Sequence, residues 1–142
     1  MVKLEKIQCR ALRYVYRDFT SSYSDLRKRS NNSLLYVNRL RLILCEVYKC
    51  VYKLNPSYLH ELFTFNETVY NTRGNNKLRH KTYNYVKFGK ENVSYTGVVL
   101  WNNLTDEFRK CITFNNFKQL INVWNGPMCA CSSCNICILH MI

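Results

Sequence analysis

The chain has 142 residues, of which 47% are hydrophobic, and it contains only 4 Gly and 2 Pro. This composition excludes a disordered or fibrous protein, and the length suits one compact domain with its own core. The chain carries 21 Lys and Arg against 9 Asp and Glu, a formal net charge of +12; such an imbalance favours a polyanionic partner, of which nucleic acid is the usual one, and a merely basic surface is the alternative.

No apolar run approaches the roughly 18 residues that a membrane span needs, and residues 1–6 lead into a charged segment rather than a secretory leader. We therefore expect no membrane partner, no secretion, and a cytoplasmic or nuclear location. Outside secretion, scattered cysteines are expected to be reduced core residues rather than disulfide partners. These are Cys9, Cys45, Cys50 and Cys111.

The first predicted helix covers residues 3–17 and carries two separate stripes. Apolar residues recur along it at helical spacing, so we expect them to form its buried face. They are Leu4, Ile7, Ala11, Tyr14 and Val15. The second stripe contains only cations, which repeat at i, i+4, i+7 and i+11 with one more beside them. They are Lys6, Arg10, Arg13 and Arg17, with Lys3 adjacent. This stripe is the first candidate nucleic-acid-binding group, because it could follow a phosphate backbone.

Two helices are predicted next. Ser22 followed by Asp25 has the spacing of a capping box, so a short helix should begin here and run to Arg29. The longest helix is predicted over residues 36–54, with apolar side chains on two sides, which indicates a central position in the core. One apolar face comprises Tyr36, Leu40, Ile43, Val47, Cys50, Val51 and Leu54, and the other comprises Cys45, Tyr48 and Tyr52.

Asn55 and Pro56 are predicted to cap and open a short helix over residues 57–63. After residue 64 the period changes, and we expect short strands or an extended arm near residues 68–90. This segment holds a second candidate nucleic-acid-binding group, in which cations alternate with aromatic side chains that could stack on unpaired bases. The group comprises Arg79, Lys81, Tyr83, Tyr85, Lys87 and Lys90. A solvated basic face beside core aromatics is the alternative.

Residues 97–103 form an apolar run too short to show a period, and we favour a helix there. Thr105, which precedes two acidic residues, and Thr113 are predicted N-caps of two further helices. Trp101 and Trp124 lie in apolar patterns typical of a core, so we expect them to pack rather than to bind a ligand.

Together these elements predict a mainly α protein. A compact helical domain with a small β or extended element should occupy residues 1–126, and a cysteine-rich tail should follow over residues 127–142. The tail offers soft ligands suited to a tetrahedral Zn²⁺ site. They are Cys129, Cys131, Cys134 and Cys137, with His140 three residues further on. Because the Cys-x-x-Cys steps share Cys134, a closed site would be cramped, and a free, oxidisable tail is the alternative.

Residues 94–104 read Ser-Tyr-Thr-Gly-Val-Val-Leu-Trp-Asn-Asn-Leu, and they precede a Phe-anchored helix, a Trp and the cysteine cluster. This order resembles the C-terminal region of reverse transcriptases from non-LTR (LINE-type, jockey-like) retrotransposons. Shorter similarities at residues 7–13, 54–59 and 70–73 extend the resemblance over most of the chain. It implies a non-catalytic region downstream of the polymerase that helps hold template RNA or target DNA, with the remainder of a reverse transcriptase as a partner.

The sequence departs from the family pattern at two places. Thr105 stands where the family often has Pro, which is tolerable because Thr can cap the next helix. Cys137 and His140 lie beyond the family's usual three cysteines, so the resemblance leaves the limits of any metal site open.

The chain lacks the residue pattern of a polymerase. Two-metal catalysis needs paired aspartates, whereas the only aspartates, Asp18, Asp25 and Asp106, are widely separated. We therefore expect a fragment of a reverse-transcriptase-like protein that is not an enzyme and takes no small-molecule substrate.

Two other functions remain open at this stage. The main alternative is a basic, zinc-dependent protein-interaction module unrelated to transposition, which would keep zinc without binding nucleic acid. A weaker one is a thiol hydrolase that uses a cysteine of the tail with His140. That chemistry would need an oriented base and an oxyanion site.

Overall fold

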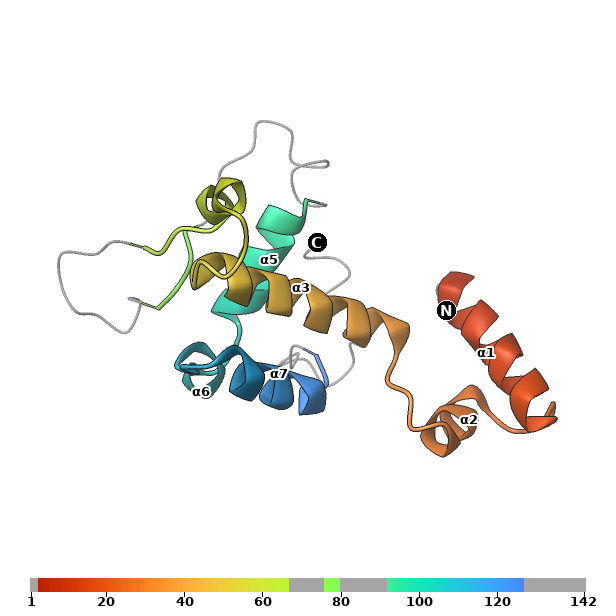
Figure 1. The fold of residues 1–142 in the computed structure, drawn as a ribbon. Helices are drawn as coiled ribbons and strands as arrows, with labels where there is room; N and C mark the ends of the chain where they lie inside the picture. The colour runs from red at the N-terminus through yellow and green to blue at the C-terminus, as the bar shows by residue number, and fades with distance from the viewer. Residues whose placement is uncertain (1–2, 67–75, 80–91, 127–142) are drawn as a thin grey trace. The chain divides into compact units, whose positions relative to one another are not determined.

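The structure, a computed structural model, describes residues 3–66, 76–79 and 92–126 (Figure 1). The chain divides into two compact units, Met1–Arg39 and Leu40–Ile142. The described part is mainly helical, as predicted. None of its helices combines the length and the apolar character that crossing a bilayer requires.

The first unit contains α1 (Lys3–Tyr16), α2 (Tyr23–Arg29) and the first turn of α3 (Leu35–Val51). The predicted helix start is confirmed, because Ser22 is the N-cap of α2 and its side chain accepts a hydrogen bond from Asp25 N at 3.3 Å. The buried apolar side chains of this unit are Cys9, Leu12, Leu26 and Val37.

The predicted buried face of α1 is wrong. Leu4, Ile7, Tyr14 and Val15 are 61 to 73% exposed, and Ala11 is exposed as well. The buried side of α1 instead carries Glu5, Cys9 and Leu12. The physical reason is that Glu5 finds hydrogen-bond partners in α2 and α3, which offset the cost of removing its carboxylate from water.

Three helices end in the same left-handed turn. A residue with positive φ lies just beyond each helix: Arg17 (50°) directly follows α1, while Asn31 (52°) and Lys53 (56°) are the second residues after α2 and α3. In each case the next amide donates to the carbonyl five residues earlier: Asp18 to Arg13, Asn32 to Arg27, and Leu54 to Lys49. This is the Schellman arrangement, in which glycine is the usual residue. The predicted helix ends at Arg17 and Leu54 are therefore corrected to Tyr16 and Val51.

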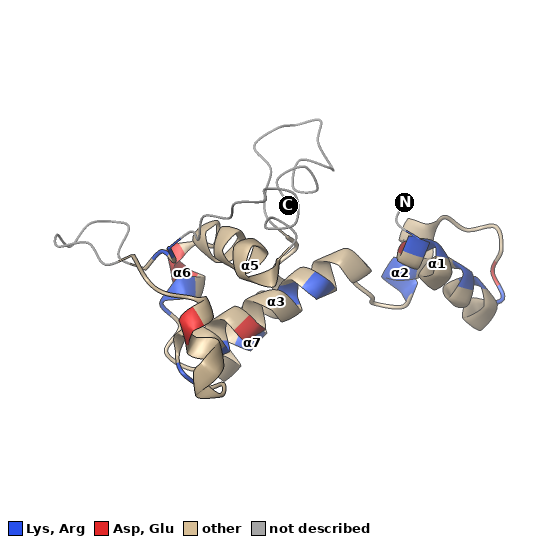
Figure 2. Ribbon diagram, turned by 90° about the horizontal axis from the view of Figure 1, so that it is seen from above, with Lys and Arg blue, Asp and Glu red and all other residues tan. Residues whose placement is uncertain are grey.

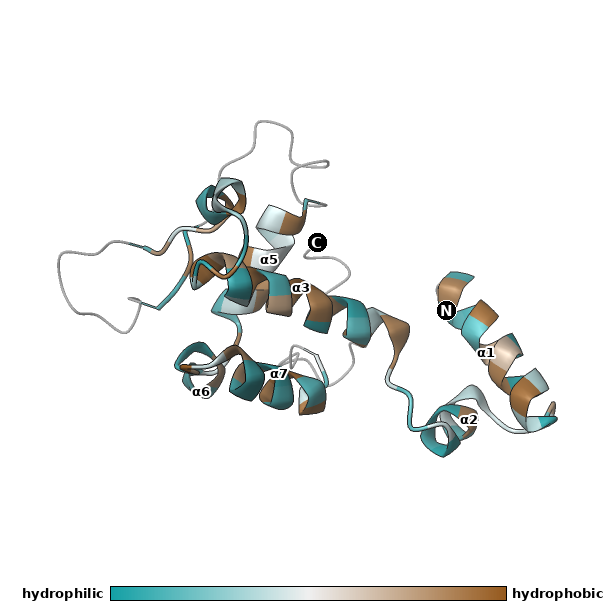
Figure 3. Ribbon diagram, viewed as in Figure 1, coloured by the Kyte–Doolittle hydropathy of each residue, from teal (hydrophilic) through white to brown (hydrophobic). Residues whose placement is uncertain are grey.

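Among its described residues, the second unit contains the remainder of α3 and four further helical elements. They are the 3₁₀ helix η1 (Ser57–Leu62), α5 (Val93–Asn102), α6 (Asp106–Arg109) and α7 (Phe114–Val123). The ambiguous apolar run thus forms a helix, as predicted. Hydrophobic and hydrophilic positions are interspersed along α3 and α7, which is typical of helices with one buried face (Figure 3), whereas the sequence predicted two apolar sides for α3.

Tyr48 of α3 connects the helices of this core. Its ring stacks on Phe117 of α7 with centroids 4.5 Å apart, and it lies 6.4 Å from Trp101 of α5. The Tyr48 hydroxyl donates to the Cys111 carbonyl at 3.0 Å. Trp101 is 0% exposed, so its predicted core role is confirmed; Trp124 is only half-buried.

The central position predicted for the longest helix is confirmed within this core, but the residues of its buried face differ. The buried side chains of α3 are Val37, Leu40, Leu44, Val47, Tyr48 and Cys50. Leu44, which is 0% exposed, was not expected there, and Leu54 lies outside the helix at 59% exposure. The Schellman turn at Lys53 ends the helix before Leu54 can join its apolar face.

Three predicted caps have different outcomes. Thr113 caps α7 as expected, since its Oγ1 accepts from Asn116 N at 3.4 Å. Thr105 occupies the N-cap position of α6, but its side chain makes no capping hydrogen bond. Pro56, not Asn55, is the N-cap of η1, and the Asn55 amide donates to Glu46 and Cys50 instead.

The predicted β or extended element is seen in part. Phe65 and Leu78 form an isolated antiparallel bridge, while most of residues 68–90 and the whole cysteine-rich tail lie outside the described residues. Of the four scattered cysteines, all are free; Cys9 and Cys50 are buried, whereas Cys45 and Cys111 are partly exposed.

Candidate nucleic-acid interface

The first basic group lies on one side of α1, as its spacing predicted. Lys3, Lys6 and Arg10 are exposed, while Arg13 is half-buried. Its Nε is buried and has no hydrogen-bond partner among the described residues. Arg17 is exposed but follows the end of the helix in the left-handed conformation. Figure 2 shows the resulting blue positions along α1. The basic face of α1, defined by Lys3, Lys6, Arg10 and Arg13, therefore presents three exposed cations.

Glu5 is the only acidic residue of α1, and it points inward. It is 6% exposed, and its carboxylate accepts a short hydrogen bond from the Tyr23 hydroxyl and another from Tyr36 N at 3.3 Å. The Tyr23 hydroxyl also lies 2.6 Å from Gln8 Oε1. Burial and the neighbouring Glu5 raise the pKa of Tyr23, so its hydroxyl stays protonated and able to donate. The solvent-facing surface of α1 consequently carries cations without an opposing carboxylate.

The last turn of α2 adds three cations that the sequence reasoning did not select. They are Arg27, Lys28 and Arg29. The Arg29 guanidinium lies 4.7 Å from the centre of the Tyr16 ring of α1, within cation–π range. The run of three basic residues is visible in the sequence. Cations in the last turn of a helix also interact favourably with the helix dipole, so such a run does not by itself indicate nucleic-acid binding.

The loop between α1 and α2 holds one carboxylate in a local network. Asp18 accepts hydrogen bonds from the backbone and hydroxyl groups of both Thr20 and Ser21, at 2.6 to 3.1 Å. The hydrogen bonds from Ser21, followed by those from Thr20, lower the pKa of Asp18 to about 2. This carboxylate therefore stays ionised at neutral pH and stabilises the loop through these hydrogen bonds.

Only Arg79 of the second basic group lies among the described residues; Lys81, Tyr83, Tyr85, Lys87 and Lys90 lie outside them. Arg79 is exposed, and so is Lys77, which sequence reasoning missed. Leu78 between them is 0% exposed. Since residues i and i+2 of an extended segment point to the same side, Lys77 and Arg79 present their charges together.

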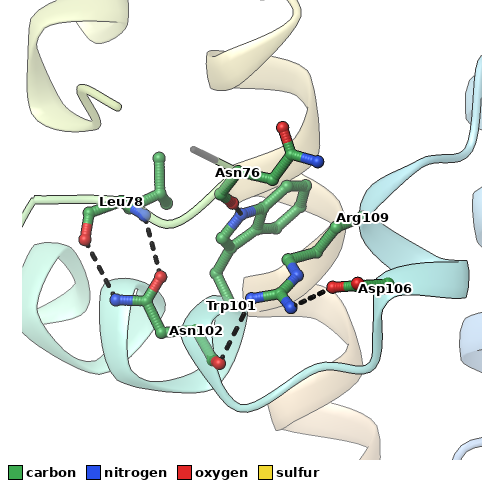
Figure 4. Close-up of polar contacts among 6 residues, drawn as sticks. All are labelled: Asn76, Leu78, Trp101, Asn102, Asp106 and Arg109. Atoms are coloured by element: carbon green, nitrogen blue, oxygen red, sulfur yellow. Dashed lines mark hydrogen bonds and ion pairs between the residues drawn. The ribbon is translucent and has the colours of Figure 1, made fainter. Parts of the chain in front are cut away.

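The extended segment is anchored to the end of α5 (Figure 4). Asn102 exchanges two hydrogen bonds with the Leu78 backbone, accepting from Leu78 N at 2.8 Å and donating to Leu78 O at 3.0 Å. The neighbouring Trp101 donates from Nε1 to the Asn76 carbonyl at 3.1 Å. Trp101 and Asn102 belong to the Leu-Trp-Asn run, so this run makes specific contacts to the segment that bears Lys77 and Arg79.

A buried arginine supports the C-terminal end of α5. Arg109 is 8% exposed; it pairs with Asp106 at 2.5 Å, and its Nη1 donates to the Asn102 carbonyl at 3.4 Å. The hydrogen bond with Arg109 lowers the pKa of the Asp106 carboxyl. The Arg109 charge is thus used inside the unit and does not belong to the exposed basic surface.

Within the described ranges, no group of three or more His, Cys, Asp or Glu side chains is arranged to hold a metal ion. The predicted Zn²⁺ ligands lie outside those ranges, so the zinc site stays a prediction. They are Cys129, Cys131, Cys134 and Cys137.

Comparison of the chain with protein-family models, curated proteins and solved structures finds no match. The candidate interface therefore rests on the charges and contacts described above.

Proposed function

We propose that this chain binds nucleic acid without catalysing a reaction, and that the basic face of α1 makes the principal contact with backbone phosphates. The observation that carries the proposal is the inward orientation of Glu5, because it leaves cations as the only charged side chains on the solvent-facing surface of α1. Phosphate contacts of this kind supply most of the affinity of non-specific nucleic-acid binding.

The dimensions of α1 suit several phosphates. A helix rises about 1.5 Å per residue, so Lys3 and Arg10 are separated by about 10 Å along its axis. One strand of a nucleic-acid duplex carries a phosphate for about every 3.4 Å of axis. Lys3, Lys6 and Arg10 can therefore contact about three phosphates of one strand.

The resemblance to the C-terminal region of non-LTR retrotransposon reverse transcriptases supports the same function. It would make the bound polyanion template RNA or target DNA, and it would make the chain an accessory to a polymerase elsewhere. The tyrosines of the second basic group, Tyr83 and Tyr85, favour a strand with unpaired bases, on which aromatic rings can stack.

The test is a titration of fluorescently labelled single-stranded RNA, single-stranded DNA and duplex DNA with the full chain at several salt concentrations. A triple variant with Lys3→Gln, Lys6→Gln and Arg10→Gln removes the accessible cations of the basic face. Each single-strand phosphate contact contributes about 0.7 to the log–log salt slope, so the slope should fall by about 2. The matched control carries Lys53→Gln, Lys110→Gln and Lys118→Gln, which removes the same charge from three other exposed positions.

The proposal requires the α1 variant to lose more of the slope than the control. An equal loss in both variants would show a diffuse effect of net charge and would overturn the assignment to α1. No binding by the unaltered chain in dilute salt would overturn the function itself. Retention of zinc in that case would support the zinc-dependent interaction module.

A further inference from the structure

We infer that Asn102 is a positioning residue for nucleic-acid binding: its carboxamide fixes the Leu78 backbone so that Lys77 and Arg79 are held on one side of the extended segment as a second phosphate contact. This inference rests on the proposed function and adds to it a contact outside α1.

The Asn102 side chain substitutes for a neighbouring β-strand. A carboxamide has one acceptor and one donor group on the same planar unit, which matches the N–H and C=O of a single extended residue. Asn102 uses both, at 2.8 Å and 3.0 Å, on the two backbone groups of Leu78. Paired bonds of this kind are otherwise exchanged between strands of a sheet.

The opposite edge of the segment is bound by residues 64–66. Asn66 N donates to the Lys77 carbonyl at 2.9 Å, and Arg79 N donates to the Thr64 carbonyl at 2.8 Å. The backbone of Lys77, Leu78 and Arg79 is therefore bound on alternate sides. Together with the buried Leu78 side chain, these bonds restrict rotation of the segment about its own axis.

Asn102 is itself held in place. It is the last residue of α5, and its carbonyl accepts a hydrogen bond from the buried Arg109 at 3.4 Å. Its neighbour Trp101 is fully buried and holds the carbonyl of Asn76, one residue before Lys77 (Figure 4). The cations thus project from a backbone that is ordered before any ligand binds, which reduces the entropy lost on binding.

The direct test compares Asn102→Ala with Asn103→Ala, the matched substitution of the next residue, which is exposed. Single-stranded RNA is the probe, and the log–log salt slope is the main measurement. Asn102→Ala should lower the slope by about 1.4, the contribution of two phosphates at about 0.7 each, and Asn103→Ala should leave it unchanged. A variant that is merely less stable would lower the active fraction without changing the slope.

A double-mutant cycle tests whether Asn102 acts through the two cations. Lys77→Gln with Arg79→Gln should lower the slope by the same amount as Asn102→Ala, and adding Asn102→Ala to this pair should lower it no further. Hydrogen exchange gives an independent measurement in the free protein. The Leu78 amide should be protected in the unaltered chain and in Asn103→Ala, and it should exchange faster in Asn102→Ala.

Several outcomes would overturn the inference. Asn102→Ala could increase exchange of the Leu78 amide and leave the salt slope of binding unchanged. Asn102 would then fix the Leu78 backbone without contributing to nucleic-acid binding, and the proposed function of α1 would still stand. If Asn102→Ala does not fold, the variant with Lys77→Gln and Arg79→Gln provides the test. An unchanged salt slope in that variant would exclude Lys77 and Arg79 as a second phosphate contact. If the unaltered chain binds no nucleic acid, the proposed function and this inference are both lost.

Discussion

Gly97 of α5 approaches Val47 of α3 so closely that a Cβ atom at Gly97 would lie 2.7 Å from Val47 Cγ2. The same atom would lie 2.9 Å from the Phe63 ring. Real Cβ atoms almost never come this near to another heavy atom, and Val47 is itself fully buried. The contact between α3 and α5 at this point therefore depends on the absence of a side chain.

Gly97→Ala should destabilise the protein for this reason. Alanine favours a helix interior over glycine by about 1 kcal/mol, but overpacking a tight core contact costs about 1–3 kcal/mol. We expect a net loss of about 1 kcal/mol in the free energy of unfolding, measured by chemical denaturation. Val93→Ala, at an exposed position of the same helix, is the control and should change stability by less than about 0.5 kcal/mol. A stabilised Gly97→Ala variant would contradict the close packing.

Lys53→Gly should stabilise the second unit. A non-glycine residue in the left-handed conformation costs roughly 1–2 kcal/mol, and Lys53 has a φ of 56°. Glycine removes that cost but adds about 0.5–1 kcal/mol of chain entropy, so we expect a net gain of about 0.5–1 kcal/mol in denaturation experiments. Lys118→Gly makes the same exchange inside α7, where φ is helical, and should instead destabilise by about 0.7 kcal/mol. Equal effects at the two positions would refute the Schellman turn.

The Asp18 network should make the α1–α2 loop sensitive to acid. Because folding lowers the pKa of Asp18 from 3.8 to about 2, the ionised carboxylate stabilises the folded loop fully above pH 3.8, and this contribution is lost as the pH falls from 3.8 towards 2. NMR titration of the Asp18 carboxyl should give the low value. Ser21→Ala removes the hydrogen bond from the Ser21 hydroxyl and should raise the pKa of Asp18. A midpoint near 3.8 in the unaltered chain would be incompatible with the network.

Glu5→Ala should destabilise the first unit by about 1–3 kcal/mol, because the Tyr23 hydroxyl and Tyr36 N–H lose a buried acceptor. Glu5→Gln keeps an acceptor oxygen and should cost less. Hydrogen exchange of α1 and α2 amides would measure the loss in this unit. Lys6→Ala, an exposed substitution one residue away, is the control and should leave exchange nearly unchanged. Similar exchange in Glu5→Ala and Lys6→Ala would show that the Glu5 bonds contribute little.

The capping and burial predictions that succeeded depended on short-range patterns. Ser22 and Thr113 accept the backbone hydrogen bonds that their spacing indicated, and Trp101 is fully buried in a strongly apolar segment. The prediction for the buried face of α1 failed because it assumed that apolar residues must point inward. Glu5 occupies that interior because Tyr23 and Tyr36, 18 and 31 residues away, provide its hydrogen bonds.

The amino-acid sequence determined by itself where most helices lie, which residues cap two of them, and that α1 carries a row of cations, since periodicity and capping act within a few residues. Only the tertiary structure decided which side of α1 is buried, why α5 needs Gly97, and that Asn102 holds Leu78. These features join residues far apart in the chain. The free energy gained by burying these groups and pairing them through hydrogen bonds decides which side of a helix is buried, even where the apolar pattern of that helix alone favours another side.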